Sequence, residues 1–151
     1  DGSLARDAGV EIGGTVNPIT AENIDEAYKS LKILNPVHMK NRLNEVSMKN
    51  WINCIDKSFQ KSNVDKSQLD YLAVLHFKYS MHKFMLSILG LEEEQSIYLR
   101  DYGHMGQIDQ ILSLVLAERE SKIKDGSIIS MIAAGIGYSW AANVIRWGKV
   151  V

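Results

Sequence analysis

The chain has little of several features that mark specialised proteins. Its single cysteine, Cys54, excludes an internal disulfide and a multi-cysteine zinc site. Its 17 basic and 18 acidic residues give a net charge of -1, whereas nucleic-acid binders usually carry a basic excess. The longest apolar candidate for a membrane span, residues 127–142, is broken by Gly135 and Gly137. These properties predict a protein with no nucleic-acid partner and no membrane partner.

The remaining composition is that of an ordinary globular domain. The 151 residues are 46% hydrophobic and 23% charged, so the chain is long enough and apolar enough to bury a core. The N-terminus lacks the basic and then apolar order of a signal peptide, and it does not begin with methionine. We therefore expect a cytoplasmic protein, and a chain that is a processed product or part of something longer.

The hydrophobic pattern alternates between strands and helices. Asn35 and Pro36 indicate a helix start, with an apolar stripe continuing to about residue 61. Residues 71–75 form a continuous apolar run, typical of a strand buried on both faces. Gly90 is placed to end a helix. The other predicted strands cover residues 10–16, 96–99, 127–133 and 138–147, and the other predicted helices cover residues 21–33, 77–89 and 107–121. This order predicts a layered α/β domain with one mixed sheet.

Three features lie at the ends of predicted strands, where α/β proteins place their sites. His76 directly follows the buried run. It is a candidate general base, and a polar residue that only closes the strand is the alternative. His104 lies in a glycine-rich loop, and Asp109 follows five residues later, where a carboxylate can fix the tautomer of the histidine. Compensation of helix charge is the alternative role for Asp109.

The third feature is the Gly-Ile-Gly turn at residues 135–137, between two apolar strands. The amides of Ile136 and Gly137 are candidate oxyanion donors, and a plain hairpin turn is the alternative. His38 and His82 lie among polar neighbours, which predicts surface positions. Cys54 falls within a predicted helix, with no basic group or helix N-terminus to lower its pKa, so we interpret it as a structural residue.

Taken together, these motifs resemble the C-terminal half of the β-ketoacyl-acyl-carrier-protein synthase III family, in the thiolase superfamily. That family has a strand ending in Pro-His-Gln-Ala-Asn, a Gly-Asn-Thr-Ser loop before a helix, and Gly-x-Gly-x-Thr-Trp between its last two strands. Here residues 75–79 read Leu-His-Phe-Lys-Tyr, residues 103–106 read Gly-His-Met-Gly, and residues 135–140 read Gly-Ile-Gly-Tyr-Ser-Trp. The opening Asp-Gly-Ser is similar to the junction between the two halves of such enzymes.

The resemblance implies half of a thiolase-like, layered αβαβα fold, a mixed sheet with helices on both faces. Residues 1–34 would be a junction segment and residues 35–151 the C-terminal domain. The resemblance also implies thioester chemistry on a cysteine of an N-terminal half, which is not in this chain. Acyl-CoA or acyl carrier protein would be the substrate, with no permanently bound cofactor and no metal. The implied partners are the N-terminal half, a second copy in a homodimer, and the carrier protein or CoA thioester.

The departures from the family pattern refine this expectation. His104 replaces the asparagine that usually assists decarboxylation. Gly-His-x-Gly-x-x-Asp is similar to a subgroup that transfers acyl groups with a Cys-His-Asp triad. By that analogy His104 is the general base, Asp109 orients it, and His76 polarises the thioester carbonyl. The backbone of Ile136 and Gly137 forms the oxyanion hole. A non-catalytic half that dimerises or binds a carrier protein is the alternative.

Overall fold

Residues 1–148 are described by a computed structural model, in which they form two compact units. The first unit contains residues 1–47 and the short segment 135–139. The second unit contains residues 48–134 and the chain from residue 140 onward. The division expected at residue 34 stays a prediction, and the last three residues of the domain predicted over residues 35–151 lie outside the described part.

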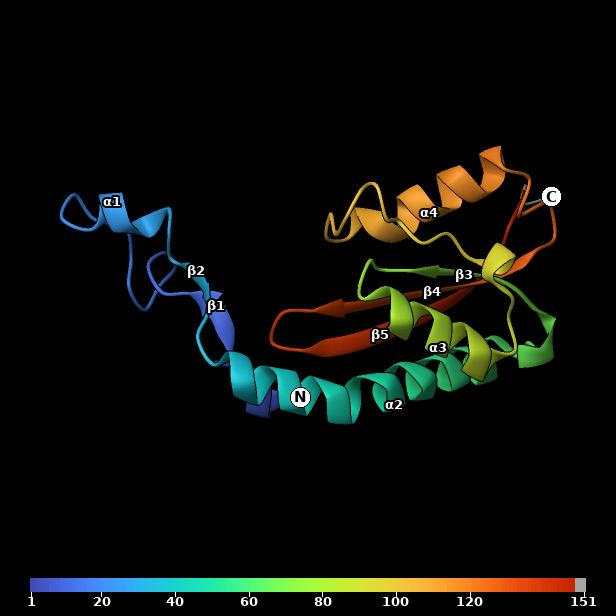
Figure 1. Cartoon of the computed structure of the whole chain (residues 1–151), viewed down its shortest axis with the longest axis horizontal. Coiled ribbons are helices and arrows are strands. Elements are labelled where there is room, and N and C mark those ends of the chain that lie inside the picture. The colour runs from blue at the N-terminus through green and yellow to red at the C-terminus, as the bar shows by residue number, and fades with distance from the viewer. Residues whose placement is uncertain (149–151) are drawn as a thin grey trace. The chain divides into compact units, whose positions relative to one another are not determined.

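The second unit is built on a three-stranded mixed sheet (Figure 1). Its strands are β3 (Leu69–Val74), β4 (Ile128–Gly135) and β5 (Ser139–Arg146), in the order β3-β4-β5. Strands β3 and β4 are parallel, whereas a tight hairpin joins β4 to β5 and so makes them antiparallel. A mixed sheet is confirmed, but the expectation of one sheet for the whole chain is wrong, because residues 8–10 and 31–33 form a separate two-stranded sheet.

Helices cover both faces of this sheet (Figure 1). On one face, Tyr71 and Ala73 of β3 pack with α4 (Ile108–Arg119). On the other face, Leu72 and Val74 pack with α3 (Tyr79–Leu89) and with the second half of α2 (Pro36–Ser62). The alternation follows from the two-residue period of a strand, and it explains why β3 is apolar at almost every position.

The predicted helix boundaries arise from local chemistry. The side-chain oxygen of Asn35 accepts the amide of His38 at 3.3 Å, so asparagine caps α2 as expected. Gly90 ends α3 with φ of 71°, a left-handed conformation that suits glycine. Its amide donates to the carbonyls of Leu86 and Ser87.

The first unit contains the regions that the sequence predicted poorly. The strand expected over residues 10–16 is instead β1 (Ala8–Val10), followed by an irregular segment in which Gly13 and Gly14 have positive φ. The helix expected over residues 21–33 is reduced to α1 (Ile24–Ala27). Residues 31–33 form β2 (Leu31–Ile33), which pairs antiparallel with β1.

Contacts distant in sequence explain why residues 21–33 do not form one helix. The carbonyl of Ser30 accepts the Glu11 amide at 3.0 Å, and its hydroxyl donates to the Ile12 carbonyl at 2.8 Å. Lys32 also pairs with Glu11 at 2.6 Å. These bonds stabilise an extended conformation after residue 30, so pairing with distant residues overrides the helical periodicity of the sequence.

Short 3₁₀ turns complete the described elements: η1 (Gly2–Leu4), η2 (Lys66–Gln68) and η3 (Glu93–Gln95). The strand expected over residues 96–99 is wrong, because only Ser96 forms a bridge, to Leu72 of β3. The hydroxyl of Ser96 also donates to the Leu72 carbonyl at 2.7 Å. Because only Ser96 is bonded to β3, residues 97–99 have no regular secondary structure.

The prediction that His82 lies on the surface is also wrong. His82 is 4% exposed and lies on the buried face of α3 with Met85 and Leu86. Its ring lies 5.4 Å from the ring of Tyr98 and 6.3 Å from that of Phe77. The spacing of three and four residues to Met85 and Leu86 signals this burial, whereas the polar sequence neighbours of His82 do not.

Burial of His82 predicts a stability that depends on pH. Burial lowers the pKa of His82 from 6.5 to about 4. Below pH 6.5 the unfolded chain binds a proton that the folded chain does not, so the free energy of unfolding falls as the pH drops from 6.5 to about 4. We expect a loss of about 3 kcal/mol across this window. Urea denaturation of the wild type and of His82→Phe, at pH 7, 5.5 and 4, measures it. If the free energy of unfolding depended on pH in the same way for both proteins, burial of neutral His82 would not be the cause of the loss.

Candidate active site

Asp109 connects two of the predicted site residues. It lies in the first turn of α4 and is fully buried. Its Oδ2 accepts the main-chain amide of His76 at 2.7 Å and lies 2.5 Å from Nδ1 of His104. Its Oδ1 accepts the amide of Met105 at 2.7 Å. One carboxylate therefore joins the end of β3 to the loop that precedes α4.

The same contacts determine the charge of Asp109. Burial by itself raises the pKa of this carboxyl, but the amides of His76 and Met105 and the His104 ring outweigh it and lower the pKa below its usual value. Asp109 is consequently a carboxylate at neutral pH. Because a carboxylate only accepts hydrogen bonds, Nδ1 of His104 carries a proton and Nε2 is left as the acceptor in the neutral ring.

Two glycines shape the loop that holds His104. Gly103 and Gly106 have φ of 69° and 72°, so the backbone takes left-handed turns on both sides of the histidine. The His104 side chain is 52% exposed, which leaves its ring accessible. The structure brings His104 and Asp109 together, and their roles in catalysis stay a prediction.

His76 lies two residues after the end of β3, and its ring lies 4.8 Å from that of Tyr98. Its Nδ1 is buried and has no hydrogen-bond partner among residues 1–148. Tyr98 also lies 4.8 Å from the ring of Tyr79 and 5.4 Å from that of His82. The aromatic cluster of His76, His82, Tyr79 and Tyr98 therefore limits where the His76 ring can lie. His76, Tyr79 and His82 follow one another at three-residue spacing, whereas Tyr98 comes 16 residues after His82, and no local motif marks Tyr98 as their neighbour.

The predicted oxyanion residues lie at the tip of the β4–β5 hairpin, which belongs to the first compact unit, whereas His76 and His104 belong to the second. Gly137 and Tyr138 have φ of 91° and 51°, and the Ile136 side chain is 71% exposed. Neither the Ile136 nor the Gly137 amide donates a hydrogen bond within residues 1–148. Both amides are therefore available to an external acceptor.

An apolar pocket of about 300 Å³ lies beside this turn, within the first unit. Asp7 and His38 each precede, in the sequence, a residue that lines this pocket. Nδ1 of His38 lies 2.7 Å from Oδ2 of Asp7, a residue that is 4% exposed. This pair could not be predicted from the sequence, because its members are 31 positions apart and no pattern connects them. The pocket is lined by Ala8, Leu31, Lys32, Ile33, Met39, Ile136 and Tyr138.

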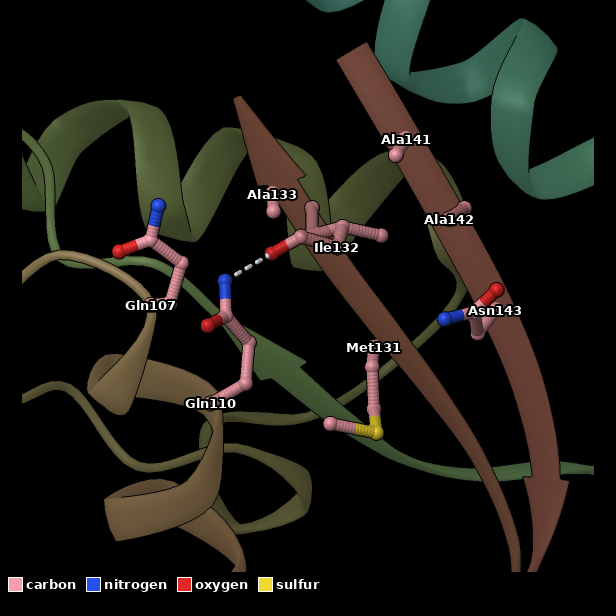
Figure 2. A pocket seen from close by; sticks show the side chains of 8 residues that line it. All are labelled: Gln107, Gln110, Met131, Ile132, Ala133, Ala141, Ala142 and Asn143. Carbon is pink, nitrogen blue, oxygen red and sulfur yellow. Dashed lines mark hydrogen bonds between the residues drawn. The ribbon is translucent and has the colours of Figure 1, made fainter. Parts of the chain in front are cut away.

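A second hollow, of about 160 Å³, lies in the second unit beside α4 (Figure 2). Gln110 is 6% exposed and donates to the Ile132 carbonyl at 2.7 Å, as the dashed line in Figure 2 shows. Small side chains of β4 and β5 border the hollow, which leaves room for another element to approach these strands. Its lining consists of Gln107, Gln110, Met131, Ile132, Ala133, Ala141, Ala142 and Asn143.

Cys54 lies on α2 as predicted, and its Sγ donates to the Trp140 carbonyl at 3.4 Å. This placement differs from that of a nucleophile at a helix N-terminus. Within residues 1–148, no group of His, Cys, Asp or Glu side chains is arranged to hold a metal ion. No helix in that range is long and apolar enough to cross a bilayer.

The second unit has a mixed sheet with helices on both faces, and superposition on known structures shows that the fold is thiolase-like. A crystal structure of β-ketoacyl-[acyl carrier protein] synthase III from Thermus thermophilus superposes with a TM-score of 0.76 at 18% identity, over 99% of this chain and 44% of that one. The acyltransferase ChlB3 superposes with a TM-score of 0.60 at 19% identity, over 95% of this chain and 42% of that one.

Sequence comparison identifies the family within this class. Residues 59–147 match the family described as 3-oxoacyl-[acyl-carrier-protein (ACP)] synthase III C terminal, and the chain belongs to that family. It is similar to the β-ketoacyl-[acyl-carrier-protein] synthase III of Azobacteroides pseudotrichonymphae, at 27% identity over 98% of this chain. The Synechocystis enzyme of the same name is 31% identical over 62% of this chain. The matched region makes up 28% of that enzyme. The chain spans 43% of the Azobacteroides relative, which is less than half its length.

Proposed function

We propose that this chain is the C-terminal half of an acyltransferase or condensing enzyme of the ketoacyl synthase III type. It would move an acyl group from CoA or acyl carrier protein to a carbon or hydroxyl acceptor, through a thioester on a cysteine of the N-terminal half. The single observation that carries this proposal is the His104–Asp109 pair, at 2.5 Å, in a glycine-rich loop beside His76. Family membership and the thiolase-like fold support it.

Each group has a defined task in this mechanism. Nε2 of His104 takes the thiol proton of the cysteine, while Asp109 holds the ring and stabilises the imidazolium. The thiolate attacks the thioester carbonyl, which His76 polarises. The amides of Ile136 and Gly137 stabilise the tetrahedral oxyanion. The CoA or carrier thiolate then leaves with the proton from His104, and the acyl group remains on the cysteine.

The same proposal assigns the partners. The N-terminal half supplies the nucleophile and covers the apolar face of α4, and the complete enzyme forms a homodimer in the cytoplasm. The position of Cys54 supports a nucleophile outside this chain, because its sulfur bonds a main-chain carbonyl in the middle of α2. By itself the chain would be inactive in acyl transfer.

The same cysteine geometry also supports an alternative, a non-catalytic half that dimerises or binds a carrier protein. The two functions differ in what mutation does. An enzyme loses acyl transfer when His104 is replaced by alanine, whereas carrier binding by a docking module survives replacement of both His76 and His104.

The intact mass of the denatured protein, purified from its source with any co-purifying chain, tests the proposal. We expect about twice the mass of this chain, or a second chain of similar size. The cysteine of that half should then gain the mass of an acyl group on incubation with acyl-CoA, and His104→Ala should reduce this gain. This chain by itself, or acyl transfer retained in His104→Ala, would contradict the enzymatic proposal.

A further inference from the structure

The ring of His76 is held by packing rather than by a hydrogen bond. Oδ2 of Asp109 accepts the main-chain amide of His76 at 2.7 Å, but the His76 side chain makes no hydrogen bond within residues 1–148. His104 differs, because the same carboxylate contacts Nδ1 of its ring. The orientation of the His76 ring therefore depends on a neighbouring side chain that touches it without a hydrogen bond.

Tyr98 is the aromatic residue in contact with the His76 ring. The two ring centroids lie 4.8 Å apart and the ring planes are tilted by 32°, a geometry in which aromatic pairs attract one another. The Tyr98 ring also meets the ring of Tyr79 at 4.8 Å and the edge of His82 at 5.4 Å. The Tyr79 hydroxyl donates to Glu93 at 2.6 Å, whereas that of Tyr98 has no hydrogen-bond partner within residues 1–148. Tyr98 thus acts in this cluster through its ring.

The backbone on either side of Tyr98 is anchored, although this segment is irregular. Ser96 bridges to Leu72 of β3, and its hydroxyl donates to the Leu72 carbonyl at 2.7 Å. Leu99 is 1% exposed, and its carbonyl accepts the amide of Gly103 at 2.9 Å. These anchors place the Tyr98 ring against His76 without a regular strand.

The packing also determines which ring nitrogen of His76 carries the proton. Nδ1 is buried and has no partner within residues 1–148. Buried N–H groups without an acceptor are rarer than buried acceptors without a donor, so the proton of the neutral ring belongs on Nε2. A second proton on Nδ1 would bury a charge without a partner. His76 is consequently a neutral donor through Nε2, whereas Nε2 of His104 is an acceptor.

We propose that Tyr98 is the positioning residue of His76: its ring holds the imidazole in the Nε2-protonated form, so that Nε2–H stays available to polarise the thioester carbonyl. The inference rests on the acyl transfer proposed above. Tyr98 does for His76 by aromatic contact what Asp109 does for His104 by a hydrogen bond. Because Tyr98 acts through His76, its loss should change the rate of the chemical step and leave substrate affinity unchanged.

The rate of acyl-enzyme formation, measured by intact mass at several acyl-CoA concentrations, tests this role on the chain combined with its N-terminal half. Tyr98→Leu keeps an apolar side chain and removes the ring. It should load at least about 10-fold more slowly at saturating acyl-CoA, with the half-saturating concentration unchanged. Tyr98→Phe should load at the wild-type rate, because the hydroxyl makes no hydrogen bond.

Phe84→Leu is the matched control, since it removes an exposed aromatic ring from α3, the helix that carries Tyr79 and His82. It should load as the wild type does. Loading by Tyr98→Leu at the wild-type rate, or equal losses in Tyr98→Leu and Tyr98→Phe, would overturn the assignment of the Tyr98 ring.

The ¹⁵N NMR spectrum of this chain, labelled at histidine, separates failure of the inference from failure of the proposed function. At neutral pH, His76 should be protonated on Nε2 in the wild type and in Tyr98→Phe, and Tyr98→Leu should show both tautomers. Comparison with His76→Gln identifies the signals. A wild-type His76 protonated on Nδ1, or an unchanged tautomer in Tyr98→Leu, would overturn the inference. The expected spectra together with no acyl-enzyme in the wild type would instead contradict the proposed function.

Discussion

Replacing Asp109 with asparagine is expected to reduce acyl transfer about 10⁴-fold, a loss typical of a base held in the wrong tautomer. The carboxylate of Asp109 accepts from three donors, the amides of His76 and Met105 and Nδ1 of His104. An asparagine offers one oxygen and one NH2 group, so at least one donor faces another donor. The His104 ring then rotates or changes its tautomer, and Nε2 no longer serves as the base.

The same substitution should weaken the fold. Asp109 is fully buried, and each buried donor left without a partner costs about 1–3 kcal/mol. Because the folded pKa of Asp109 is lowered, its stabilising effect is present above its ordinary pKa of 3.8 and is lost as the pH falls through the lower folded value. Asp109→Asn should therefore be less stable at pH 7 and should lose less stability than the wild type on acidification below pH 3.8.

Hydrogen exchange and kinetics together check this prediction. In Asp109→Asn, the amides of His76 and Met105 should exchange faster, and acyl-enzyme formation should fall with them. Asp101→Asn is the matched control, because it removes an exposed carboxylate from the same loop. Unchanged exchange at both amides together with normal acyl transfer would show that Asp109 neither holds the loop nor orients the base.

The parts of the fold that the sequence predicted are those that local chemistry determines. Asn35 caps α2 through its own side chain, and Gly90 supplies the left-handed end of α3. Strand β3 is apolar on both faces because helices cover both faces of the sheet. Residues 21–33 were mispredicted because their partners lie far away in the sequence, at Glu11 and Ile12, and short helical periodicity does not report such pairing.

The site divides in the same way. His104 and Asp109 are five residues apart on either side of a helix start, so their spacing made the contact one of two alternatives, the other being compensation of helix charge by Asp109. The amide of His76 reaches the same carboxylate from 33 residues away, through its backbone, and backbone contacts leave no trace in residue type. The His38–Asp7 pair depends on the tertiary arrangement of the first unit, which the sequence predicted poorly.

The apolar face of α4 carries the second large prediction. Ile108, Ile111 and Val115 are spaced by three and four residues, so they lie on one side of the helix, and they are 60%, 52% and 37% exposed. Their opposite side packs on β3, and the hollow beside α4 is bordered by the small residues Ala133 and Ala141 (Figure 2). Such a surface suits a second helix packed against α4 and the sheet.

We therefore expect this chain by itself to self-associate and to become monodisperse when the N-terminal half is co-expressed. Ile111→Asp places a charge in the centre of the proposed interface and should weaken binding of that half at least about 100-fold, because a buried, unpaired carboxylate is costly. Ile88→Asp, an exposed position on α3, is the control and should bind as the wild type does. Sedimentation velocity and isothermal titration calorimetry measure both effects. A monodisperse monomer of the isolated chain, or equal affinities for the two variants, would mean that α4 faces solvent rather than a partner.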